Sequence, residues 1–144
     1  MSEVTKNTDP GTTSTEGGSG ELQDSSRQLA LSVVEGAMDK KALSIEIIDV
    51  REKVDYTDYV VVMSGRSDRQ VGAIAKGVQQ HVKQALGVHC LGVEGLPQGQ
   101  WALLDFGDVV VHIFHEDTRG YYDIESLWMD AARLPSPADE PGYS

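Results

Sequence analysis

The stretch that decides the fold class begins at residues 58–65, DYVVVMSG, and continues through residues 67–87, SDRQVGAIAKGVQQHVKQALG. Its first part contains the unbroken apolar run Tyr59–Met63. A strand that is apolar at every position is typical of one buried on both faces of a sheet. The run therefore predicts a strand in a central position, with helices or further layers covering both of its sides.

The second part of this stretch predicts the longest helix of the chain. Ser67 is followed three residues later by Gln70, which is the pattern of a capping box at a helix N-terminus. Gly87 is typical of the residue just after a helix ends. Between them, apolar residues recur with the helical period over four turns: Val71, Ile74, Ala75, Val78, Val82, Ala85 and Leu86.

Outward from this unit, the pattern predicts the order α-β-β-α-β-β-β-α. A first helix is expected from about Ser25 or Ser26 to Lys40, and a last helical piece over about residues 121–133. The remaining strands are expected at residues 44–50, 88–94, 100–105 and 109–115, and the last two form an antiparallel hairpin around Phe106-Gly107-Asp108. The unit 58–94 is expected to be a right-handed parallel crossover. The fold class is α/β (α+β), with a mixed sheet of about five strands packed by helices.

Composition divides the chain into one domain and two tails. Residues 1–24 are rich in Thr, Ser, Gly and Glu and nearly lack large apolar side chains, so we expect them to be disordered. We expect the same of residues 135–144, PSPADEPGYS. Residues 25–134 form the predicted domain. The formal net charge is −11, and residues 116–130 alone carry five acids against one arginine.

These features exclude several classes of protein. The single cysteine, Cys90, excludes an internal disulfide framework. The N-terminus has no apolar segment of the signal-peptide kind, and no apolar run approaches the length that spans a bilayer. We therefore expect a cytoplasmic protein. Binding to nucleic-acid backbones depends on Lys and Arg, so the acidic balance favours a basic protein partner instead.

The candidate metal ligands have simpler interpretations. Asp105 and Asp108 flank the hairpin turn and offer carboxylates for Mg²⁺, but aspartates at turns commonly cap local backbone N–H groups. His112 and His115 are three apart on a strand, so their side chains are expected on opposite faces of the sheet. His89 and Cys90 are separated in the same way. We therefore expect no metal and no cofactor, and we expect His112 to be a hydrogen-bonded residue that holds the sheet or the nearby acids.

A second candidate is the sequence Ser64-Gly65 before the long helix, which resembles the arrangement in nucleotidyltransferases. Those enzymes need paired metal-binding aspartates on the strand after that helix. Residues 88–94, VHCLGVE, contain no such pair. The site is expected to be catalytically empty. An enzyme that uses Ser64-Gly65 with Asp105 and Asp108 stays the alternative, together with a self-assembling scaffold.

Aromatic and acidic residues are concentrated near the end of the predicted domain. Trp101, Phe106, Tyr121, Tyr122 and Trp128 lie within 28 residues, interleaved with acids. Each aromatic alone is compatible with core packing. Together, aromatic anchors beside acids are also typical of a protein-docking surface, because the rings supply affinity and the charges steer association. Both interpretations stand at this point.

At these residues the chain resembles the ribosomal silencing factor family, also called RsfS or Iojap. The resemblance spans about residues 26–130. It rests on residues 57–61 (TDYVV), Ser64, Gly65, Ser67, Arg69, residues 92–95 (GVEG), Trp101, residues 105–112 (DFGDVVVH), Arg119, Tyr122, Glu125, Leu127 and Trp128. It implies a mixed-sheet domain distantly similar to nucleotidyltransferases but without their catalytic acids.

The resemblance also implies a function. Members of this family bind the large ribosomal subunit at its fourteenth protein (the uL14 type) and block subunit joining by steric exclusion. On this sequence, the docking surface would comprise Trp101, Asp105, Phe106, Tyr122, Glu125 and Trp128. Phe106 stands where an aliphatic residue is expected in some relatives. The sequence leaves open whether the protein forms a homodimer.

Overall fold

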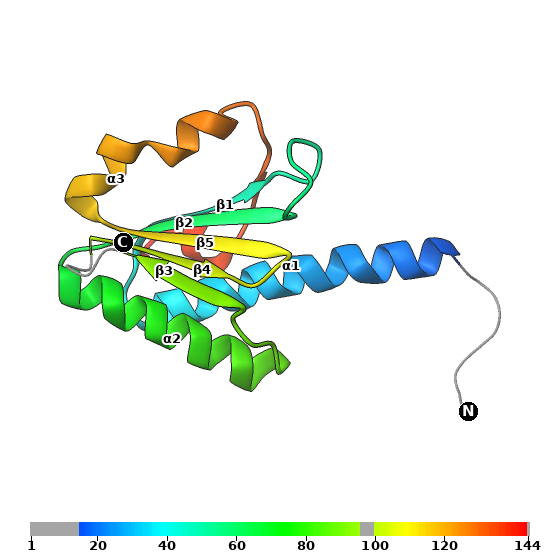
Figure 1. The fold of residues 1–144 in the computed structure, drawn as a ribbon, viewed down its shortest axis with the longest axis horizontal. Helices are drawn as coiled ribbons and strands as arrows, with labels where there is room; N and C mark the ends of the chain where they lie inside the picture. The colour runs from blue at the N-terminus through cyan, green and yellow to red at the C-terminus, as the bar shows by residue number, and fades with distance from the viewer. Residues whose placement is uncertain (1–14, 96–99, 144) are drawn as a thin grey trace.

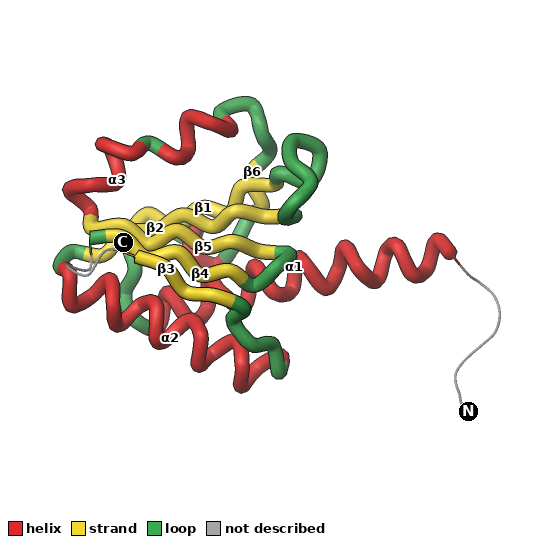
Figure 2. The backbone as a smooth tube through the Cα atoms, in the orientation of Figure 1, coloured by secondary structure: helices red, strands yellow, loops and turns green. Residues whose placement is uncertain are grey.

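The computed structural model describes residues 15–95 and 100–143, with the side chains of residues 15–24 excepted. A six-stranded mixed sheet forms its centre, in the order β3-β4-β5-β2-β1-β6 (Figure 2). The strands are β1 (Leu43–Asp49), β2 (Tyr59–Gly65), β3 (Gly92–Gly95), β4 (Trp101–Asp105), β5 (Val109–His115) and β6 (Arg133–Leu134). The helices are α1 (Thr15–Asp39), α2 (Asp68–Leu86) and α3 (Glu116–Tyr122), followed by two 3₁₀ turns, η1 (Ile124–Trp128) and η2 (Pro137–Asp139).

The predicted central strand and long helix are confirmed. Every residue of β2 is buried, and the strand lies between β5 and β1. Ser67 caps α2 by accepting a hydrogen bond from the backbone N–H of Gln70, and Gly87 ends it in the left-handed conformation at φ 69°. The Gln70 side chain accepts from the N–H of Arg66 rather than from that of Ser67, so the return bond is displaced by one residue from a regular capping box.

The two faces of the sheet are covered differently. Helices α1 and α2 pack against one face, and α3 with η1 lies over the other (Figure 1). Alternate residues of each strand divide between these faces, as the pleat requires. On the α1–α2 face, Val61 of β2, Val111 of β5 and Leu104 of β4 belong to the larger hydrophobic cluster. On the other face, Val60 and Val62 of β2 and Phe114 of β5 belong to a smaller cluster.

Strand β3, which follows α2, lies farther from β2 in the sheet than a crossover between neighbouring strands would place it. Strand β2 pairs in parallel with β5, whereas β3 pairs with β4 in antiparallel fashion at the sheet edge. The late hairpin inserts β4 and β5 between the two strands that α2 connects. Strand β3 still runs in the same direction as β2. It begins at Gly92 and not at Val88, since Val88 and Cys90 pack against the core from the preceding loop.

Three further element boundaries differ from the prediction. Helix α1 begins at Thr15 and not near Ser25, because extending a helix that packing has already nucleated costs far less than starting one. The last helical piece is divided at Asp123, whose φ of 48° ends α3 before η1 begins. Helix α3 starts at Glu116, where the His115 side chain accepts from the N–H of Asp117.

The C-terminal segment that we expected to be disordered packs on the domain instead. Arg133–Leu134 adds a sixth strand beside β1. Ser136 and Asp139 form a reciprocal capping box around η2. The Tyr143 hydroxyl donates a hydrogen bond to the carbonyl of Ala42, and its ring packs against the larger cluster. A few well-placed side chains thus order a segment whose composition resembles a tail.

Candidate docking face

The sheet face beneath α3 and η1 carries most of the residues that the sequence singled out. Along β4, Trp101, Leu103 and Asp105 share this face, because Ala102 and Leu104 contact the larger core on the other side. On neighbouring β5, Phe114 pairs with Trp101 and His112 pairs with Leu103. The strands therefore present an aromatic surface at the end of the sheet where α3 begins.

Four rings of this face form a continuous stacked series. The centroids of Trp101 and His112 are 6.3 Å apart, those of His112 and Phe114 are 6.0 Å apart, and those of Phe114 and Tyr122 are 5.7 Å apart. These distances lie in the range over which aromatic pairs stabilise one another. Tyr121 meets Tyr122 edge to face at 5.4 Å.

A groove of about 200 Å³ opens along this series; we call it the aromatic groove. It is lined by Trp101, His112, Phe114, Tyr122 and Ile124. Tyr122 is 51% exposed and Tyr121 is 85% exposed, so two rings stand beside the groove within reach of a partner. An apolar groove with exposed aromatic rims is a geometry that can receive an apolar side chain of another protein.

The segment over the groove is held by Arg119 of α3. Its Nη1 donates to the carbonyl oxygen of Ser44, 2.6 Å away, and to Oγ of Ser64, 3.0 Å away. Its Nε and Nη2 both donate to Oε2 of Glu125, at 2.9 and 2.7 Å. Glu46 of β1 lies 3.7 Å from the same guanidinium and 2.9 Å from Nε of Arg133. One arginine thus joins α3 and η1 to β1 and β2.

The structure places five of the six predicted docking residues in three groups. Trp101 and Tyr122 line the aromatic groove. Glu125 and Trp128 belong to η1, where Glu125 pairs with Arg119 and Trp128 packs half-buried against the smaller cluster. Asp105 lies at the other end of β4, four residues and roughly 13 Å from Trp101.

Phe106 does not belong to an exposed surface. It is 5% exposed and forms part of the larger core between the sheet and the α1–α2 layer. Its place continues the alternation of Ala102 and Leu104, which face the same core. A ring buried in this way packs the core and offers a partner little surface, so Phe106 is not carried into the proposed docking face. The alternation of side chains along residues 101–106 could have shown this from the sequence, because Phe106 falls on the same side as Ala102 and Leu104.

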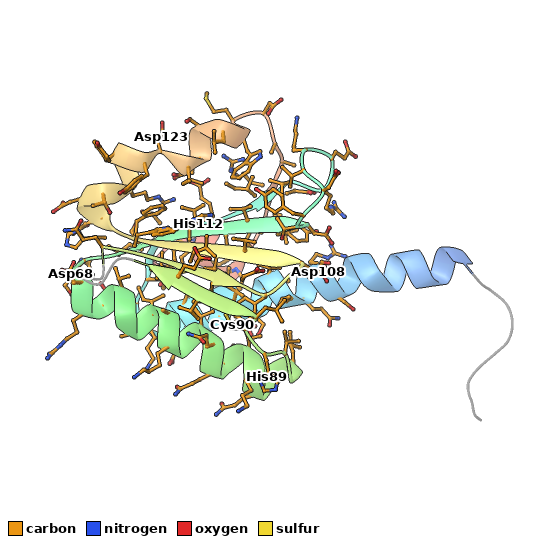
Figure 3. The ribbon with its side chains drawn as sticks, in the orientation of Figure 1. Asp68, His89, Cys90, Asp108, His112 and Asp123 are labelled. Carbon is orange, nitrogen blue, oxygen red and sulfur yellow. The ribbon has the colours of Figure 1, made fainter. Side chains whose placement is uncertain are left out.

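The two halves of the rival nucleotidyltransferase site lie at opposite ends of the sheet. Tyr59 is paired with Val109 and Gly65 with His115, so the turn that bears Asp108 lies beside the start of β2. Six residues of strand, roughly 20 Å, separate that turn from Ser64-Gly65. Figure 3 places Asp108 and Asp68, the first residue of α2, toward opposite ends of the sheet.

Asp105 and Ser64 have local partners. Oδ1 of Asp105 accepts from the backbone N–H of Gly107 at 2.8 Å, and Gly107 has a φ of 88°. This is the turn geometry that the sequence predicted. The Ser64 hydroxyl accepts from Arg119. Each of these groups is thus engaged in holding the fold.

The histidines and the cysteine are spread over the molecule. His112 lies on the sheet below α3, whereas His89 and Cys90 lie beyond the end of α2 (Figure 3). His115 caps α3. In the described ranges, 15–95 and 100–143, no group of three or more His, Cys, Asp or Glu side chains is placed to hold a metal ion.

His112 has a specific role on the docking face. Its Nδ1 accepts a hydrogen bond from the indole Nε1–H of Trp101 at 3.3 Å, as expected for a histidine that holds the sheet. Burial lowers the pKa of His112 below its usual value of 6.5, because the charged form loses hydration. The imidazole is therefore neutral over the neutral pH range. Sequence reasoning did not connect His112 with Trp101, since their contact depends on the register of the hairpin.

This geometry defines the class of the protein, which is an α+β domain with a mixed six-stranded sheet and an open aromatic face. In the described part of the chain, no helix combines the length and the apolar character that crossing a membrane requires. The family described as "Ribosomal silencing factor during starvation" matches residues 23–142. This match includes most of the C-terminal segment that we had set apart as a tail.

Individual relatives agree with the family match. Ribosomal silencing factor RsfS of Zymomonas mobilis is 40% identical over 96 residues, which are 67% of this chain and 71% of that protein. The RsfS of Bacillus subtilis is 41% identical over 93 residues, 65% of this chain and 78% of that protein. The chloroplastic protein Iojap of Zea mays is 33% identical over 115 residues, 76% of this chain and 47% of the plant protein.

A solved structure supports the same relationship. The crystal structure of a protein from Chromobacterium violaceum superposes with a TM-score of 0.69 at 37% sequence identity, covering 81% of this chain and 94% of that one. The chain belongs to the ribosomal silencing factor family.

Proposed function

We propose that this protein binds the large ribosomal subunit through its fourteenth protein, of the uL14 type, and prevents the small subunit from joining. The observation that carries the proposal is the family match over residues 23–142, which spans all six strands of the sheet and α1 from residue 23 onward. Bacterial relatives at 40% and 41% identity are named ribosomal silencing factors. The residues proposed for docking are Trp101, Tyr122, Trp128, Glu125 and Asp105.

The charge and shape of the docking face support a basic protein partner. Residues 116–130, which include α3 and η1, carry five acids and one arginine. That arginine is already paired with Glu125, and Asp130 is paired with Lys53. Glu116, Asp117 and Asp123 are exposed and remain available to a basic partner. Association should therefore be fast and salt-dependent, with the aromatic groove supplying the contact that holds the complex.

The proposed mechanism is steric and needs no covalent chemistry. A factor bound to the joining face of the large subunit occupies the place that the small subunit needs. Repression then depends on the occupancy of one site, which follows from the affinity and the concentration of the factor. The protein would act in the cytoplasm, as a non-enzymatic repressor of translation.

Co-sedimentation tests this proposal directly. Purified protein is centrifuged through a density gradient with large subunits, with small subunits and with joined ribosomes. We expect it to travel with free large subunits only. A subunit-joining assay should then show fewer joined ribosomes as the concentration of the protein rises. Equal binding to small subunits, or undiminished joining at saturation, would contradict the proposal.

The rival enzyme predicts a different result. A nucleotidyltransferase that uses Ser64-Gly65 with Asp105 and Asp108 would turn over nucleotides in the presence of Mg²⁺. The separation of those groups at opposite ends of β2 and β5 speaks against that arrangement. Metal-dependent turnover by the pure protein that is lost in the double variant Asp105→Asn, Asp108→Asn would favour the enzyme.

A further inference from the structure

The contact between Trp101 and His112 fixes the orientation of an indole ring at the rim of the aromatic groove. The Trp101 Nε1–H donates to Nδ1 of His112 at 3.3 Å, and the two rings are stacked with an interplanar angle of 24°. The imidazole also stacks on Phe114 at an angle of 5°. The imidazole thus stacks on Phe114 and accepts a hydrogen bond from the one N–H group of the indole.

This hydrogen bond requires one protonation state of the imidazole. An acceptor at Nδ1 means that the ring is neutral and carries its proton on Nε2. When the ring becomes charged, both nitrogens become donors. The indole N–H then faces another N–H across 3.3 Å, and the bond is replaced by a repulsive contact. Trp101 loses the partner that holds its ring at the rim.

We propose that His112 is a positioning residue for the docking face, which holds Trp101 ready for the partner while neutral and releases it on protonation, so that binding weakens in acid. The proposal rests on the proposed function, because it assumes that Trp101 contacts the ribosomal partner. It also makes a claim about the free protein, namely that the state of the Trp101 indole follows the charge of His112.

Among the residues that the structure describes, no acidic side chain beside His112 is free to pair with a charged ring. Burial is the cause that lowers its pKa. Tyr122 of α3 shares the groove. Glu125 of η1 is occupied by Arg119 of α3. From β4, Asp105 lies on the same face but bonds to its own turn. From β3, Glu94 is paired in register with Leu103, beyond the β4 strand. The neighbouring residue of β2 is Val62, which is apolar.

The first experiment uses the free protein. The chain has two tryptophans, so its nitrogen-15 spectrum has two indole N–H signals, and the Trp128→Phe variant assigns them. The pH is lowered from about 8 to about 5, the range in which histidines titrate. We expect the Trp101 signal to shift with the same midpoint as the His112 ring, while the Trp128 signal does not follow that midpoint. A Trp101 signal that ignores the His112 titration would overturn the proposal.

The second experiment measures binding of the purified large-subunit partner over the same pH range. The His112→Asn variant places an amide oxygen near the position of Nδ1, where it accepts without titrating. Loss of one hydrogen bond should weaken wild-type binding roughly three- to tenfold below the His112 midpoint. The variant should show no such loss. His89→Asn, a substitution of the same kind outside the groove, should behave like the wild type.

The outcomes separate this proposal from the proposed function. If His112→Asn loses affinity in acid as steeply as the wild type, His112 is not the switch. If the Trp101 signal follows His112 but the partner is not bound at any pH, the ribosomal assignment fails, and with it the docking consequence. If the His112→Asn chain does not fold, the titration of the wild-type Trp101 signal still decides the positioning claim.

Discussion

Arg119 and Glu125 form the closest ion pair of the docking face, with 2.7 Å between Nη2 and Oε2. Both side chains are largely buried, with 11% and 23% exposed. Because the same guanidinium also bonds Ser44 and Ser64, this pair fixes the position of α3 and η1 over the sheet. The aromatic groove therefore depends on Arg119, which is not itself among the residues proposed to contact the partner.

The first prediction concerns this anchor. Arg119→Met should lower the free energy of unfolding by about 2–3 kcal/mol, because the charged hydrogen bonds are lost and Glu125 keeps an unpaired, partly buried charge. Chemical denaturation measures this difference. Arg69→Met, on the exposed first turn of α2, is the matched control and should stay within about 0.5 kcal/mol of the parent. Equal effects of the two substitutions would show that Arg119 is not an anchor.

The second prediction separates packing from docking at Phe106. Phe106→Ala should lower the free energy of unfolding by about 3–5 kcal/mol, because it leaves a cavity in the larger core. Phe106→Leu, which keeps most of the apolar volume, should cost less than about 1.5 kcal/mol. Both variants, measured under conditions where they are folded, should bind the ribosomal partner like the parent. A selective loss of binding in folded Phe106→Leu would restore the docking role.

The third prediction concerns the C-terminal segment. A chain ending at Leu134 should melt at least about 5 °C below the parent, which corresponds to roughly 1 kcal/mol for a domain of this size. The cause is the loss of the packing of Ala138 and Tyr143 on the core and of the Tyr143 hydrogen bond to Ala42. Tyr143→Phe should reproduce only a part of this loss. An unchanged melting temperature would return residues 135–144 to the status of a tail.

The parts of the fold that depend on neighbouring residues could be predicted from the sequence. The helix from Asp68 to Leu86 is set by its own caps and period, and the hairpin turn by Gly107 at positive φ. The partner of β2 could not be predicted in this way. Which strand lies beside it depends on contacts between residues about fifty positions apart, as between Tyr59 and Val109. The crossover rule gave the direction of β3 but not its place.

The candidate site shows the same division. Trp101 and Tyr122 were singled out as aromatic residues near acids, and the structure places both of them at one groove, whereas their docking role stays a prediction. Phe106 was assigned to the docking face because the alternation of side chains along the strand was not followed from Trp101 to Phe106. The C-terminal segment was misjudged because composition describes an average, whereas a single ring such as Tyr143 can pack a polar segment onto the core. Arg119 attracted no role because its partners come from β1, β2 and η1.

The fourth prediction follows from the lowered pKa of His112. In the unfolded chain this group takes up its proton near the usual value of 6.5, whereas in the folded protein it does so at a lower pH. Between the two values the unfolded state binds more protons, so stability falls as the pH falls. This contribution to stability is complete above pH 6.5 and is lost as the pH falls through the pKa of His112 in the folded protein. The difference in unfolding free energy between wild type and His112→Asn, measured at several pH values, should show this decline, and a flat difference would contradict it.

The last prediction concerns the aromatic docking residues. Trp101→Ala and Tyr122→Ala should each weaken binding to the purified large-subunit partner by about 2 kcal/mol or more, which is roughly thirtyfold. Trp128→Ala should weaken binding too, and should also lower stability, because its ring packs against the smaller cluster. Tyr56→Ala is the matched control, since that ring is 66% exposed and lies outside the groove. Each variant is first shown to be folded by circular dichroism.

Glu125→Lys is expected to slow association and reduce its salt dependence. Because it also breaks the pair with Arg119, Asp123→Lys at the neighbouring α3 terminus is the cleaner test of charge alone. If folded Trp101→Ala and Tyr122→Ala both bind like Tyr56→Ala, the partner does not use the aromatic groove, and the docking surface lies on another part of the molecule.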